Sequence, residues 1–123
     1  MKVNQVGNNQ NINSRANISI FAKGDLLSKN DKNFLIEKAK NIGSSSDTIR
    51  IFLSKLQGFD LKKIETMIRI FFASGNDDFH KDTSFTIIKG SYKDRQKYSF
   101  DFINDYLDSL ENSQKESFIK TEE

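Results

Sequence analysis

The chain has 123 residues, no cysteine, and nineteen Lys or Arg side chains against seventeen Asp or Glu, for a net charge of +2. This length fits one domain, the absence of cysteine excludes disulfides and thiolate metal sites, and the small net charge excludes a global field that would drive binding to polyanions. No run approaches the roughly 20 apolar residues of a membrane helix, and residues 1–15 have no signal-peptide core, so a cytoplasmic protein is expected.

The start of the chain differs in composition from the rest of the sequence. Residues 1–14 are rich in Asn and Gln and have no hydrophobic period, which predicts a flexible arm. Apolar and polar residues then alternate over residues 16–22 at the period of a strand. We therefore predict a single α+β domain over residues 15–112, followed at 113–123 by a polar tail or an extension of the last helix.

A helix is predicted over residues 29–42. Ser28 stands three residues before Asp31, so its hydroxyl can accept a hydrogen bond from a first-turn amide, and the carboxylate lies near the positive end of the helix. Gly43 follows as the expected left-handed stop. The apolar stripe of this helix consists of Leu35, Ile36, Ala39 and Ile42, and the side chains expected to point outward are Lys32, Lys38 and Lys40.

Three further segments favour strands. Apolar and polar residues alternate over 48–56, and again over 84–90 after the turn-forming sequence SGNDD. The segment LKKIETMIRIFFA at 61–73 fits both a helical stripe and a strand alternation. We favour a strand there because β-branched and aromatic residues predominate.

The last predicted element is an amphipathic helix that follows Ser99 as its N-cap. Its apolar face carries Phe100, Ile103, Leu107 and Leu110. Its polar face carries Asp101, Asn104, Asp105, Asp108 and Glu111. A solvated acidic stripe is the ordinary property of such a face, so we assign no acid or base chemistry to these carboxylates.

The order strand, helix, three strands, helix predicts an α+β fold with a mainly antiparallel four-stranded sheet and both helices on one face. The opposite face has no predicted cover. The strand period places on that face Phe21, Arg50, Phe52, Met67, Arg69 and Phe71. Because Phe, Met and Arg are enriched at interfaces, we predict that this face binds a protein partner or a second copy of the chain. The alternatives are that a terminal segment covers it, or that the strand parity is wrong by one residue.

The segment KGSYKDRQKY at 89–98 combines basic and aromatic residues, which could pair with phosphates and stack on bases. The candidate nucleic-acid residues are Lys89, Tyr92, Lys93, Arg95 and Lys97. The alternative is a solvated turn that joins a strand to the last helix, with Tyr98 partly buried. We favour the turn, because the acidic helix after it would repel the same phosphates.

No residues suggest a catalytic or metal site. Asp77, Asp78, His80 and Asp82 lie close together in sequence, but their spacing matches neither zinc nor calcium ligands. The glycines are scattered, so no phosphate loop exists, and the single histidine makes a Ser-His pair improbable. We predict no cofactor, no metal and no catalytic residue, and hence a small non-enzymatic binding or regulatory protein. The alternatives are an RNA- or ribosome-binding protein, and a small enzyme of unknown chemistry.

Two families have a similar order of elements. Over residues 15–113 the order is similar to that of the ribosome hibernation factor family, small proteins that sit on the ribosome, although SGNDDFHKD replaces the compact hairpin of that family. The helix, three strands and helix also resemble a double-stranded RNA-binding domain, whose Gly- and Lys-rich helix start is not reproduced by KDRQKYSF. These resemblances imply RNA or ribosome binding as an alternative function and assign no residues.

Overall fold

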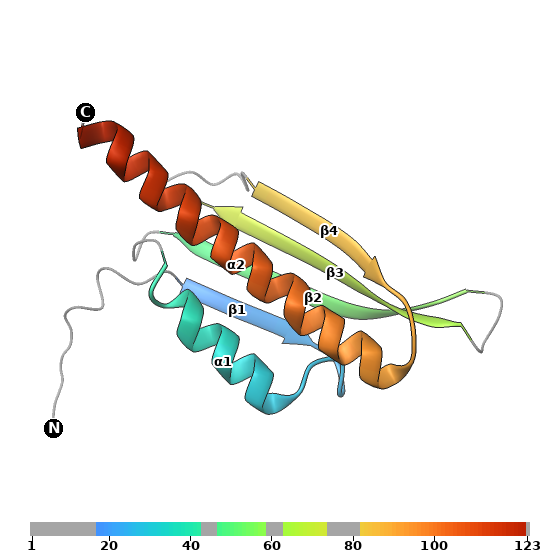
Figure 1. Cartoon of the computed structure of the whole chain (residues 1–123). Coiled ribbons are helices and arrows are strands. Elements are labelled where there is room, and N and C mark those ends of the chain that lie inside the picture. The colour runs from blue at the N-terminus through green and yellow to red at the C-terminus, as the bar shows by residue number, and fades with distance from the viewer. Residues whose placement is uncertain (1–16, 43–46, 59–62, 74–81, 123) are drawn as a thin grey trace, which may run out of the picture.

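A computed structural model describes residues 17–42, 47–58, 63–73 and 82–122. Its elements have the predicted order of strand, helix, three strands and helix (Figure 1). They are β1 (Asn17–Ala22), α1 (Lys29–Ala39), β2 (Thr48–Gln57), β3 (Ile64–Ala73), β4 (Asp82–Ile88) and α2 (Tyr92–Glu122). The fold class is therefore α+β, and the ambiguous segment that ends at Ala73 is a strand over its described part. The predicted arm at 1–14 and the predicted stop at Gly43 lie outside the described residues.

The four strands form one sheet in the order β1-β2-β3-β4. β3 pairs antiparallel with both β2 and β4, whereas β1 pairs parallel with β2, with Ile20 opposite Ile51. The sheet is therefore mainly antiparallel, as predicted, but it is mixed rather than purely antiparallel because the pair β1–β2 is parallel. The cause is the connection: a hairpin reverses the chain, but α1 carries it back to the starting end, so β2 runs in the direction of β1.

Both helices pack on the same face of the sheet and run side by side in the same direction (Figure 1). The core between them and the sheet consists of alternate strand residues and the apolar stripes of α1 and α2. Its most deeply buried members are Leu35, Ile42, Ile49, Ile51, Ile68, Ile70, Ile103 and Leu107. These are the apolar positions that the strand and helix periods predict.

The N-terminus of α1 is capped as predicted, since the Ser28 hydroxyl accepts a hydrogen bond from the Asp31 amide at 3.1 Å. The α-helix ends at Ala39, one turn before the predicted end. Tighter hydrogen bonds continue the turn, because the amide of Ile42 donates to the carbonyl of Ala39 at 3.0 Å. Ile42 is still buried, so the predicted stripe keeps its role although its last turn is not α-helical.

Lys38 was predicted to point into solvent, but its side chain contacts α2 instead. Its ammonium donates to the Asn104 side-chain oxygen at 2.6 Å and forms an ion pair with Asp108 at 2.5 Å. Both partners belong to α2, so Lys38 joins the two helices. The helical period could not show this contact, because it depends on how the helices lie beside each other.

The start of α2 corrects the predicted N-cap at Ser99. The helix begins at Tyr92, and the Ser91 hydroxyl accepts a hydrogen bond from the Asp94 amide at 3.2 Å. Ser91 and Asp94 therefore repeat the Ser-x-x-Asp pattern that caps α1. Gly90 precedes them with a φ of +119°, a conformation that favours glycine.

Candidate functional site

The open face is the sheet face that points away from α1 and α2. The structure places on it all six residues predicted from strand parity, and none of the described elements covers them. Their neighbours in sequence on the same strands, such as Ile51 and Ile70, are fully buried on the helix side. The parity prediction is confirmed for β1, β2 and β3.

The strand register aligns these side chains in rows across the sheet. One row consists of Phe21, Phe52, Arg69 and Phe85, and the next row contains Arg50 and Phe71. Phe85 and its neighbour Ile87 on β4 extend the surface beyond the predicted residues. The alternation of β4 was visible in the sequence, but the face that it presents is determined only by its register with β3.

The aromatic rings of the open face contact one another. The Phe21 and Phe52 rings stack with centroids 4.9 Å apart, and Phe52 and Phe71 meet edge to face at 5.7 Å. The guanidinium of Arg69 lies 5.1 Å from the centroid of the Phe71 ring. One face of each ring is therefore used within the cluster.

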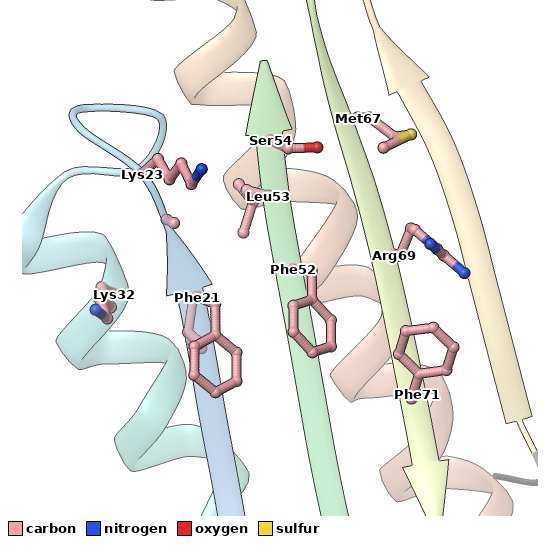
Figure 2. A pocket seen from close by; sticks show the side chains of 11 residues that line it. Phe21, Lys23, Lys32, Phe52, Leu53, Ser54, Met67, Arg69 and Phe71 are labelled. Carbon is pink, nitrogen blue, oxygen red and sulfur yellow. The ribbon is translucent and has the colours of Figure 1, made fainter. Parts of the chain in front are cut away.

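The open face is hollowed beside this cluster, with a volume of about 680 Å³ (Figure 2). Its apolar walls include the three phenylalanines of β1, β2 and β3 and also Met67. Its cationic sides are Lys23 and Lys32 beyond β1, and Arg69 on β3. Neither lysine was predicted to belong to this surface, because Lys23 comes after a strand and Lys32 lies on a helix.

The described part of the open face is cationic. Its carboxylate is Glu65 on β3, and this group lies 3.9 Å from the Lys89 ammonium. Within the described ranges, no carboxylate forms an ion pair with the four remaining cations, Lys23, Lys32, Arg50 and Arg69. The exposed acidic residues of α2, such as Asp101 and Asp105, belong to the opposite layer of the fold.

From Tyr92 onward, the basic segment at 89–98 is the start of α2 rather than the predicted turn. Lys93 and Lys97 are exposed, and Tyr98 is about half exposed. Arg95 is only 8% exposed, although it was predicted to be solvated. The segment therefore does not present all of its predicted nucleic-acid candidates on one surface.

Arg95 fixes the N-terminus of α2 to the sheet. Its guanidinium donates to the Thr66 hydroxyl on β3 and to the carbonyl of Gly90, each at 3.2 Å. Arg95 lies four residues before Ser99 and eight before Ile103, so it extends the buried stripe of α2 toward its N-terminus. Because Arg95 and Ser99 in that stripe are polar, the apolar pattern of the sequence did not reveal the first two turns of the helix.

Tyr92 and Gln96 hold the loop between β1 and α1 against α2. The Tyr92 hydroxyl donates to the backbone carbonyl of Asp25 at 2.6 Å, and the Gln96 amide donates to the same oxygen. This loop carries Lys23, so the start of α2 helps to position a cation of the open face.

We predict that the pKa of Tyr92 is raised above the ordinary value of a tyrosine. Partial desolvation of the hydroxyl and then the Asp25 carboxylate raise its pKa, and the Arg95 guanidinium opposes them. A pKa that is raised on folding stabilises the fold below the unfolded value of about 10 and loses that contribution as the pH rises through the folded value. Ring resonances followed by NMR against pH should show a midpoint above 10 for Tyr92. A midpoint at or below 10 would contradict the contact with Asp25.

The acidic residues between β3 and β4 in the sequence add no described site. Asp77, Asp78 and His80 lie outside the described residues. Within the described ranges, no group of three or more His, Cys, Asp or Glu side chains could hold a metal ion. Nor does that part of the chain contain a helix that is long and apolar enough to cross a membrane.

The sequence matches no protein-family model and no curated protein. The open face is therefore interpreted from its own residues and geometry.

Proposed function

We propose that the chain is a small non-enzymatic binding protein and that the open face is the surface that binds another protein. The observation that carries this proposal is a contiguous set of exposed apolar side chains on a regular sheet. Phe21 is 53% exposed and Phe52 37%, and the Phe52 ring contacts those of Phe21 and Phe71. Phe85, 56% exposed, lies in the same cross-strand row beyond Arg69. Contiguous exposed apolar surface of this kind is typical of interaction sites, because covering it removes apolar area from water.

The ring geometry favours a protein over a nucleic acid. A base stacks on a free aromatic face, but Phe21 and Phe52 stack on each other and Arg69 lies over Phe71. One face of each ring is thus used within the cluster, and the remaining apolar ring surface and the Arg69 guanidinium are groups against which aliphatic and aromatic side chains of a partner can pack.

Single-stranded RNA is the second candidate ligand. The observation that favours it is the group of four cations on and beside the open face, which have no ion-pair partner among the described carboxylates. Phosphates would bind there with a strong dependence on salt concentration.

We predict that Phe52→Glu abolishes partner binding while the protein stays folded. The substitution places a charge in the middle of the aromatic row, where a partner would have to desolvate it. Pull-downs from native lysate should recover a set of proteins with the wild type and lose it with Phe52→Glu. Circular dichroism should remain native, because Phe52 lies outside the core.

The matched control is Tyr98→Glu, which makes the same change at an exposed aromatic residue on α2, in the helical layer. It should retain the same proteins as the wild type. Equal retention by Phe52→Glu would contradict the proposal, and loss of the native fold would show that Phe52 belongs to the core. Nucleic acid in the wild-type fraction that disappears with Phe52→Glu would favour the second candidate.

A further inference from the structure

We propose that the partner segment is acidic as well as apolar: a large apolar side chain enters the hollow of the open face, and carboxylates on both sides of it meet the flanking cations. This inference rests on the proposed function and specifies the chemistry of the partner. It is drawn from the juxtaposition of an apolar hollow with Lys23 and Lys32 on one side and Arg69 on the other (Figure 2).

The hollow can accept large apolar side chains. Phe21, Phe52, Phe71 and Met67 line it, and its 680 Å³ lies in the range typical of ligand pockets. The stacked and edge-to-face rings form one continuous apolar wall of the hollow. An aromatic or branched aliphatic side chain would therefore bury apolar area on both sides of the contact.

The charges around the hollow determine which residues of the partner can flank its inserted apolar side chain. The one described carboxylate on the open face, Glu65, already has a cation beside it in Lys89. The other cations form no ion pair with a carboxylate within the described ranges, so these cations would repel a basic partner and a neutral one would leave them unpaired. Complementary potentials of this kind determine which partner an interface accepts.

The spacing of the cations suits a short extended segment. β1 and β3 are two strand spacings apart in the sheet, which is roughly 10 Å, and an extended chain advances about 3.3 Å per residue. Lys23 follows β1 directly and Arg69 lies on β3, so carboxylates two to four residues apart, with a large apolar residue between them, can reach Lys23 with one group and Arg69 with the other.

A second copy of the chain fits this surface less well. A symmetric dimer presents the same patch from both subunits, so the arginines of one open face would approach those of the other. Arg50 and Arg69 would gain like-charged neighbours, and Glu65 is the one described carboxylate that could offset them. The charge pattern therefore favours a different chain as the partner.

The experiment selects short random peptides by phage display on immobilised wild-type protein and discards every peptide that also binds Phe52→Glu. We expect the remaining peptides to contain more Asp and Glu than Lys and Arg, and to carry an aromatic or large aliphatic residue. Synthetic copies should bind about two- to fivefold more weakly to Lys23→Gln and to Arg69→Gln, with less difference at high salt. Lys93→Gln, which neutralises an exposed lysine of α2, is the matched control and should leave the affinity unchanged.

Each contrary result has a distinct meaning. Peptides that depend on Phe52 but are neutral or basic would overturn this inference and leave the proposed function standing. The absence of any Phe52-dependent peptide would overturn both. Displacement of a selected peptide by mixed-sequence single-stranded RNA, with the same dependence on Phe52, would replace the peptide by RNA as the ligand. Self-association in sedimentation that Phe52→Glu abolishes would make a second copy the occupant.

Discussion

Replacing Leu107 with alanine is expected to lower the free energy of unfolding by about 2 to 5 kcal/mol. The Leu107 side chain is completely buried between α2 and the sheet, so truncation removes apolar contacts and leaves a cavity. Urea unfolding followed by circular dichroism measures the change, provided that the slope of the transition is the same for both proteins.

Asp105→Ala is the control for this substitution, because Asp105 is exposed on the outer face of the same helix. Its effect should stay within about 0.5 kcal/mol, as for most surface substitutions. Asp108 would be a poor control, since its carboxylate pairs with Lys38. Equal losses for Leu107→Ala and Asp105→Ala would mean that the face of α2 is assigned incorrectly.

The regular helices and strands could be predicted because their hydrophobic patterns continue over many residues and because capping residues mark some of their ends. In β2, Ile49, Ile51 and Leu53 alternate with Arg50 and Phe52. Once the first set is assigned to the core, every residue of the strand is assigned to one of the two sheet faces. The start of α1 is marked by a capping hydroxyl whose hydrogen bond is local. Such features depend on neighbours in sequence, which is why they can be read without tertiary information.

The parallel pairing of β1 with β2 could not be read in this way. An edge strand can be parallel or antiparallel with the same residues buried, since the alternation of Ile18 and Ile20 is unchanged by its direction. The connection through α1 was the available signal, because a helical crossover is the usual link between parallel neighbours.

Part of the candidate site could be predicted from the sequence, and part of it could not. Strand parity identified the aromatic and arginine side chains of β1, β2 and β3, because each lies between buried neighbours. Lys23 was missed because it comes after the end of β1. Lys32 was missed because it belongs to α1, and only the packing of α1 beside β1 brings it to the hollow. Phe85 required the register between β3 and β4.

Replacing Arg95 with glutamate is expected to destabilise the protein by about 3 kcal/mol, through the loss of buried hydrogen bonds and the burial of an unpaired carboxylate. Arg95 is 8% exposed, and its described hydrogen-bond acceptors are the neutral oxygens of Thr66 and Gly90. A shorter anionic side chain can donate to neither oxygen. The gain from a negative charge near a helix N-terminus, about 0.3 to 1 kcal/mol at the surface, is too small to compensate.

Lys93→Glu separates this effect from a general effect of charge, because Lys93 lies in the same helical turn but is exposed. It should change stability by no more than about 0.5 kcal/mol. Arg95→Met separates packing from charge, since methionine replaces the aliphatic stem and leaves no buried ion. A small loss for Arg95→Met beside a large loss for Arg95→Glu would assign the cost to the buried carboxylate, and equal losses would assign it to the hydrogen bonds to Thr66 and Gly90. If Arg95→Glu were as stable as Lys93→Glu, the guanidinium would not fix α2 to the sheet. Residues 89–98 would then be a solvated cationic surface, as the sequence predicted.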